Sequence, residues 1–195
     1  MADLEKLENF MRLLHGVQGV KRISRRPDQL ERHNTGEHTF ELALMCWYLG
    51  HTNKLKLDFE KVLKYALAHD IVEVYAGDTL FSDEEGHKTK KAREASALKR
   101  IEEEFPEFKD LTNTIHEYEE LGTPEAKFVY AADKLIDPVN HGMEETQSIW
   151  KEYNISWETL LKHKTHKIKE SDVVLLYWNK LLEKLEAKKD FFFPN

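Results

Sequence analysis

The stretch AHDIVE, residues 68–73, places one imidazole and two carboxylates among apolar side chains. Apolar residues precede it at helical spacing, so the sequence predicts a helix from about Asp58 to Tyr75. Within that helix His69 continues one apolar row, and Asp70 continues the neighbouring row. Adjacent residues on a helix are about 100° apart, so both side chains can face one cavity.

Two further polar side chains occupy positions where a core is expected. His38 begins an apolar stripe in a predicted helix from Asn34 or Thr35 to about Gly50, and Asp133 lies in the middle of the apolar face of another. Each alone has a simpler interpretation, a hydrogen-bonded core histidine or a capping aspartate. Together, two imidazoles and two carboxylates are costly to bury unpaired. A divalent cation makes the set favourable, and mixed His and Asp ligands suit a transition metal better than calcium.

Composition restricts the class of protein. The 195 residues include 36 Asp and Glu against 29 Lys and Arg, a net charge of −7, which argues against binding a nucleic acid polymer. The apolar share of 41% can build a core. A single cysteine, Cys46, excludes an internal disulfide framework and fits a cytoplasmic protein. The sequence has no apolar run long enough for a transmembrane helix and no signal-peptide pattern at its start, so no membrane association is expected.

Glycine and proline are few and leucine is abundant, which favours helices over strands. We expect an all-α fold, with residues 1–195 forming one helical bundle and no strands. The basic segment Lys21–His33 is expected to be a loop. The remaining predicted helices are Leu4 to about Gly16, His87–Glu104, Phe108–Glu120, Pro124–His141, Glu144–Tyr153, Trp157–Lys164 and Ser171–Lys188.

Several blocks of sequence, taken in order, resemble a known family. The pattern His38, then His69-Asp70, then Asp133 resembles the H…HD…D signature of the HD-domain phosphohydrolases. The wider match resembles the branch that contains the 5′-deoxynucleotidases, and it covers about residues 13–150, with the helices of residues 155–188 expected to pack on that region. The blocks are Glu37-His38, Ala68–Glu73, Gly77-Asp78, Lys88–Glu94, Glu125–Val129 and Ala132–Leu135.

The resemblance implies a single HD-domain helical bundle that binds one divalent metal ion: Mn, Co, Zn, Fe, Ni or Mg. The ligands carried over are His38, His69, Asp70 and Asp133. The implied activity is removal of phosphate from a nucleoside 5′-monophosphate, a small phosphate ester. An HD-type phosphodiesterase, a triphosphohydrolase and a non-catalytic regulatory module are the alternatives.

Two acids are expected to serve catalysis. Glu73 lies three residues after Asp70, on the same face of the predicted helix, where it can hold or deprotonate a water molecule. Its simpler interpretation is an exposed helical glutamate. Asp78 follows Gly77 in a tight loop, and in the enzymes that the chain resembles the matching acid assists catalysis. Its simpler interpretation is a turn-forming aspartate.

The substrate residues are expected in the basic segment. The deoxynucleotidases carry Arg-Trp-Pro there, and the resemblance places Arg25-Arg26-Pro27 on that motif, with Arg25 meeting the phosphate. Arg26 replaces the tryptophan that excludes the ribose 2′-hydroxyl, so deoxyribose selectivity is not implied. Lys88 is a further candidate for the phosphate. For both segments a solvated charged surface is the alternative.

Three features leave alternatives open. His116 and His141 invite a second metal ion, as in some proteins of the family that use extra histidines. Phe191–Phe193 is interpreted as a plug docked on the body of the protein or as an oligomer contact. We also expect a homodimer.

Overall fold

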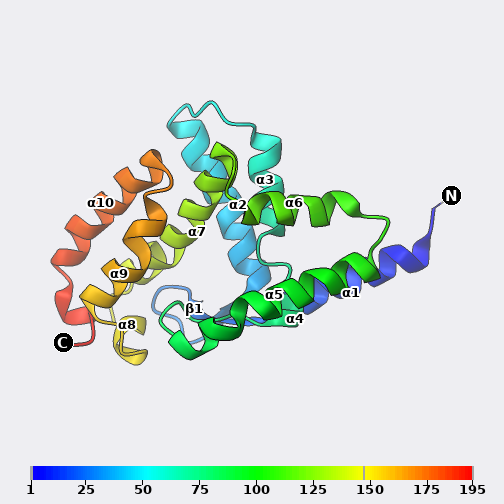
Figure 1. Cartoon of the computed structure of the whole chain (residues 1–195). Coiled ribbons are helices and arrows are strands. Elements are labelled where there is room, and N and C mark those ends of the chain that lie inside the picture. The colour runs from blue at the N-terminus through cyan, green and yellow to red at the C-terminus, as the bar shows by residue number, and fades with distance from the viewer. Residues whose placement is uncertain (1, 147, 195) are drawn as a thin grey trace.

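The computed structural model describes residues 2–146 and 148–194, and most of these residues are helical (Figure 1). The all-α prediction is confirmed. The elements in chain order are α1 (Leu4–Gly19), β1 (Lys21–Arg25), β2 (Arg32–Asn34), α2 (Thr35–Thr52), α3 (Phe59–Ala68), α4 (Glu73–Ala76), α5 (Glu84–Glu104), α6 (Lys109–Glu119), α7 (Pro124–Gly142), α8 (Ile149–Glu152), α9 (Trp157–Ile168), α10 (Asp172–Glu186) and the 3₁₀ turn η1 (Lys189–Phe191).

Helix α7 is the central element of the fold. It contacts α2, α3 and α6 on one side and α9 and α10 on the other (Figure 1). Thr123 caps its N-terminus by accepting a hydrogen bond from the amide of Ala126 at 3.1 Å, and Pro124 occupies the first helical position. Because α7 is surrounded by other helices, most of its side chains are buried, and Asp133 lies near its middle.

The hydrophobic core has two parts. The larger part joins α2, α3 and α7 to α9 and α10, and Leu42, Val129 and Trp178 are among its fully enclosed side chains. The smaller part lies between α1, α5 and α6 and includes Ile101 and Ile115. The segment that follows α3 contributes Ala68, Ile71 and Val72 to the smaller part, so the His-Asp dipeptide lies where the two parts meet.

The predicted helix from Asp58 to Tyr75 is wrong in its second half, because α3 ends at Ala68. The Nδ1 atom of His69 lies 2.9 Å from the carbonyl oxygen of Ala66, the acceptor that a continuing α-helix would offer to the amide of Asp70. The following amides bond three residues back, among them that of Glu73 to the carbonyl of Asp70. A tight turn of residues 69–72 therefore separates α3 from the short helix α4.

The segment Lys21–His33 is not a loop, and the expectation of no strands is wrong at this place. β1 and β2 pair antiparallel, with Lys21 opposite Asn34 and Arg25 opposite Arg32. The sequence does not indicate the hairpin because its strands are short and its buried side chains are polar or charged. Its turn contains Asp28 at a φ of 55°, whose carboxylate accepts hydrogen bonds from the amides of residues 145 and 146.

The C-terminal part differs little from the expectation. The predicted helix Glu144–Tyr153 is reduced to α8, and its residue 147 lies outside the described residues. The docked-plug interpretation of the tail holds for Phe192, which is 4% exposed and stacks on Trp150 with ring centroids 4.2 Å apart. No helix in the described parts of the chain is long and apolar enough to cross a membrane. The homodimer and the cytoplasmic location stay predictions of the sequence.

The contact between α2 and α3 yields a stability prediction. A Cβ atom added at Gly50 would lie 2.0 Å from Cζ of Phe59, so Gly50→Ala must displace a partly buried aromatic ring that packs against the core. We expect a loss of roughly 1–3 kcal/mol of unfolding free energy, as for other overpacked cores. Thermal or urea unfolding measures it. Gly19→Ala is the matched control, since its added Cβ meets nothing within 4 Å, and it should be neutral or slightly stabilising. Equal stability of the two variants would contradict the packing described.

A second prediction concerns His141, which is buried on α7 with its ring nearly perpendicular to that of Trp150. Burial lowers the pKa of His141 to about 4, with Lys164, Arg25 and His33 adding to the effect and Asp137 opposing it. The unfolded chain binds a proton here below about pH 6.5, whereas the folded chain does not bind it until about pH 4. Stability must therefore fall as the pH falls through this window.

The measurement compares urea unfolding at pH 7.5 and pH 5 in the wild type and in His141→Leu. The wild type should lose about 2 kcal/mol more than the variant over this interval. His166→Leu removes an exposed histidine and should keep the wild-type pH dependence. An identical loss in the wild type and in His141→Leu would show that His141 is not held neutral.

Candidate metal centre

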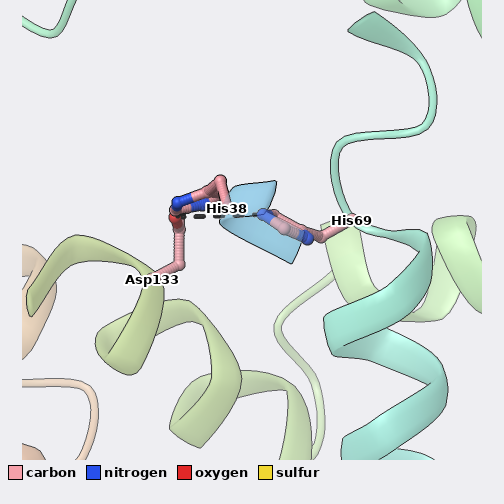
Figure 2. A group of neighbouring side chains, drawn as sticks. All are labelled: His38, His69 and Asp133. Carbon is pink, nitrogen blue, oxygen red and sulfur yellow. Dashed lines mark hydrogen bonds and ion pairs between the residues drawn. The ribbon is translucent and has the colours of Figure 1, made fainter. Parts of the chain in front are cut away.

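Three side chains from distant parts of the sequence converge beside the middle of α7. His38 lies in the first turn of α2, whose start is fixed by a capping box between Asn34 and Glu37. His69 follows the last residue of α3, and Asp133 comes from α7. Figure 2 shows the three side chains pointing toward one another, and each offers a ligand atom within 4.8 Å of the other two.

The distances place the ligand atoms around one point. Nε2 of His38 lies 3.0 Å from Oδ1 of Asp133, and Nε2 of His69 lies 3.9 Å from the same oxygen. Asp70 completes the group, because its Oδ2 lies 3.0 Å from Nε2 of His69 and 3.8 Å from Nε2 of His38. The structure therefore brings together all four residues that the sequence predicts as ligands.

The hydrogen bonds of His69 test whether a metal ion fits. Its Nδ1 lies 2.9 Å from the carbonyl oxygen of Ala66, which requires the proton on Nδ1. The buried Nε2 makes no well-aligned hydrogen bond, although it lies 3.0 Å from Oδ2 of Asp70. Burial opposes protonation of His69, but Asp70 and Asp133 raise its pKa. Metal-binding histidines commonly donate one ring nitrogen to a carbonyl and bind the metal through the other. The donor set thus fits a divalent transition metal ion.

The carboxylates of the group favour the ionised form that a metal ligand needs. Burial opposes ionisation, yet His69 and Arg22 hold the pKa of Asp70 well below its usual range. Burial likewise opposes the ionisation of Asp133, but Lys134, His38 and His69 lower its pKa. Both acids are therefore available as anions at neutral pH.

Arg22 is the residue of the site that sequence reasoning missed. Its guanidinium lies 2.8 Å from Asp70, 3.6 Å from Glu73, 3.7 Å from Asp137 and 4.0 Å from Asp78. Burial alone would lower the pKa of Arg22, but these four carboxylates raise it above its ordinary value. The sequence Lys-Arg-Ile-Ser-Arg of β1 has no apolar alternation, so it gives no signal that Arg22 points inward.

Both predicted catalytic acids lie beside this arginine. Glu73 is 3% exposed, and its Oε2 accepts a hydrogen bond from the hydroxyl of Thr35 at 2.9 Å. Burial and the neighbouring charges of Asp70 and Asp78 raise the pKa of Glu73 to about 8, against the opposing effect of Arg22 and Thr35. Asp78 follows Gly77, whose φ of 74° turns the chain after α4.

A cavity of about 340 Å³ opens onto the group. Its wall includes seven carboxylates against five Lys and Arg side chains, so a divalent cation would balance the formal charges. The charged lining residues are Arg22, Asp70, Glu73, Asp78, Lys90, Glu94, Glu119, Asp133, Lys134, Asp137, Lys164 and Lys167.

The predicted substrate residues lie apart from the cavity wall. Arg25 is buried, but its guanidinium lies 3.0 Å from Glu144 and 2.6 Å from Glu152 and stabilises the hairpin against the C-terminal part. Arg26 is half exposed beside Glu31, and the Lys88 side chain is 67% exposed and paired with Glu85. The geometry thus favours a structural role for Arg25 and a solvated surface for Arg26 and Lys88.

The histidines considered for a second ion are separated. His116 is exposed and lies 3.0 Å from Glu102, on the surface. His141 does line the cavity, and its buried Nε2 has no hydrogen-bond partner. Its neighbour Asp137 lies 3.7 Å from Arg22, and among the described residues no further group of three metal-binding side chains forms around His141.

Comparison with known proteins identifies related sequences. A sequence model of the HD domain family matches residues 16–174. The 5′-deoxynucleotidase HDDC2 of Mus musculus is 30% identical over 131 residues, which make up 66% of this chain and 64% of the mouse protein. The human protein of the same name is 29% identical over 131 residues, or 66% of this chain and 63% of that protein. The chain thus spans somewhat less than two thirds of the length of these relatives.

Solved structures share the arrangement of helices. A predicted metal-dependent phosphohydrolase from Magnetospirillum magnetotacticum superposes with a TM-score of 0.81 and 24% identity, covering 97% of this chain and 96% of that chain. An HD-domain phosphohydrolase from Listeria innocua gives a TM-score of 0.63 at 16% identity, covering 94% and 91% of the two chains. At these identities the likeness concerns the fold. Since the family match extends over most of the sequence and includes His38, His69, Asp70 and Asp133, the chain belongs to the HD domain family.

Proposed function

We propose that the protein is a metal-dependent phosphohydrolase that removes phosphate from a nucleoside 5′-monophosphate. The observation that carries the proposal is the convergence of His38, His69 and Asp133, with Oδ2 of Asp70 only 3.0 Å from the buried Nε2 of His69. The relatives named 5′-deoxynucleotidase support a nucleotide substrate. The net charge of −7 supports a small phosphate ester over a polymer.

The four ligands would hold one divalent ion through two imidazole nitrogens and two carboxylates. Such an ion supplies Lewis-acid stabilisation of phosphoryl oxygens and lowers the pKa of water. The metal has to be identified by experiment. His and Asp donors suit Mn, Co, Zn, Fe and Ni, and carboxylates also bind Mg.

Glu73 is the proposed proton carrier. Its carboxyl group lies beside Asp70 and Asp78, and its pKa near 8 lets it hold and release a proton close to neutral pH. The hydroxyl of Thr35 donates to Oε2 and so orients the carboxyl group. Asp78 lies 4.0 Å from Nη1 of Arg22, the atom that also contacts Asp70 and Glu73, and would assist at the leaving oxygen.

In this proposal the residue that binds the phosphate is Arg22, and not Arg25 as the sequence predicts. Arg22 lines the cavity beside Asp70, whereas the guanidinium of Arg25 is occupied by Glu144 and Glu152. The planar guanidinium can offer two parallel N–H donors to a phosphate oxygen pair. A cation bound to Asp70 would weaken the ion pair between that carboxylate and Arg22, so that Arg22 could bind the phosphate.

A screen for phosphate release tests the activity. The protein is incubated with nucleoside 5′-monophosphates in the presence of Mn, Co, Mg or Zn, and free phosphate is measured. We expect release from monophosphates with at least one metal. Cleavage of diesters or release of triphosphate would instead favour another HD-type hydrolase, and no turnover with any metal would contradict the proposal.

Asp70→Ala tests the ligand set. Removing this carboxylate should weaken metal binding by ~100-fold or more and abolish turnover, while circular dichroism shows the helices retained. Asp110→Ala, an exposed aspartate on α6, is the control and should leave metal content and turnover unchanged. Wild-type metal content in Asp70→Ala would exclude Asp70 as a ligand.

Glu73→Gln tests the proton carrier. The amide keeps the size of the side chain but cannot carry the proton, so kcat should fall by ~10²–10⁴ while metal content is retained. Glu103→Gln, at an exposed position on α5, is the control. If kcat of Glu73→Gln equals that of the wild type, Glu73 takes no part in the reaction.

A further inference from the structure

Lysine side chains gather in one part of the cavity wall that the proposed mechanism does not use. Lys134 comes from α7, and Lys164 and Lys167 come from α9, which packs against α7. We call these three residues the lysine cluster. Lys90 of α5 lines the same cavity.

Two of the lysines of the cavity have a carboxylate partner. Lys134 pairs with Asp133, and Lys90 pairs with Glu94. Lys164 and Lys167 form no ion pair with any residue that the structure describes. The cluster therefore carries two ammonium groups that no carboxylate of the described chain neutralises directly.

Lys164 is the most unusual member. It is only 4% exposed, and it continues the row of Leu160 and Ile168, both fully buried, along α9. Its ammonium lies 4.9 Å from the ring centroid of Phe81, which also lines the cavity. Burying an unpaired cation is costly, and a protein keeps such a group where a ligand compensates the cost.

The charges of the cluster act on one another. The pKa of Lys164 is lowered to about 8, mainly by burial and in part by Lys134 and Lys167, while Asp137 and Asp133 oppose the shift. Burial, followed by Lys134, also lowers the pKa of Lys167. All three lysines line one cavity on two helices that pack together, so an anion placed among them would relieve their mutual repulsion.

The position of the lysine cluster, next to the candidate metal centre, indicates which kind of anion would bind there. Asp133 links the two regions, since its Oδ1 faces His38 while its Oδ2 pairs with Lys134. The cavity lies between helices and holds about 340 Å³, which suits a small molecule. A phosphate group, with up to two charges and several acceptor oxygens, can accept hydrogen bonds from more than one ammonium group.

We propose that Lys134, Lys164 and Lys167 form an anion subsite beside the metal centre, and that it takes a phosphate group. The proposal deepens the proposed function by assigning these lysines to the phosphate of the substrate, but the subsite itself is defined by the cavity and the cluster. Lys164 and Lys167 are binding residues in this account, and Lys134 also holds Asp133.

Calorimetric titration with inorganic phosphate tests the subsite. The full chain is titrated after chelation with EDTA and again with Mn added. Lys164→Met keeps the length and apolar stem of the side chain but removes the charge, so it should weaken phosphate binding at least tenfold in both states. Lys162→Met, at an exposed position of the same helix, should bind phosphate as the wild type does.

Two further variants keep the test decisive. Lys164→Arg retains the charge and should recover part of the affinity. Lys167→Met removes a half-buried charge and should also weaken binding, which covers the case in which Lys164→Met does not fold. Unchanged phosphate binding in the folded Met variants would overturn the subsite, as would complete loss of binding by the wild type on chelation.

The outcome for the subsite is separable from that of the proposed function. If no phosphate ester is hydrolysed with any metal while Lys164→Met still loses phosphate binding, the subsite stands and the hydrolase proposal fails. If phosphate esters are hydrolysed but the Met variants bind phosphate normally, the hydrolase stands and the subsite fails.

Discussion

The burial of carboxylates around Arg22 is the constraint on which the rest of the site depends. Asp70, Glu73, Asp78 and Asp137 all lie within 4.0 Å of this one guanidinium. Like charges brought together inside a protein repel strongly unless cations lie among them. The hairpin provides this cation, because β1 carries Arg22 into the interior among the four carboxylates. A divalent ion at His38, His69, Asp70 and Asp133 would add further positive charge to neutralise the carboxylates of the site.

The candidate ligands could be predicted because each interrupts an apolar pattern of a long helix or its end. His38, His69 and Asp133 occupy positions that helical periodicity assigns to the core, and the structure buries all three. The position of Glu73 was predicted for a partly wrong reason. It reaches the site through the tight turn after Ala68 and not along a continuous helix face. Over three residues, an α-helix and a turn with i to i+3 hydrogen bonds place side chains in similar positions. The wrong secondary structure therefore still predicted the right position for Glu73.

The choice between Arg22 and Arg25 could not be made from sequence. The two arginines differ only in where the hairpin points them, and that depends on pairing with β2 and on Glu144 and Glu152, far along the chain. A charged segment of this length carries no apolar alternation from which its inward face could be inferred. Lys164 did carry a signal, since it falls in the row of Leu160 and Ile168, but a lysine in such a row is ordinarily expected to extend to solvent.

The stacking of Phe192 on Trp150 joins the 3₁₀ turn near the end of the described chain to the wall of the cavity. Trp150 is part of that wall, and the ring of Phe192 stacks on it with ring centroids 4.2 Å apart. Phe192 also meets Trp157 edge to face. A truncation before Phe192 would therefore uncover part of Trp150 and loosen the cavity without removing any candidate metal ligand.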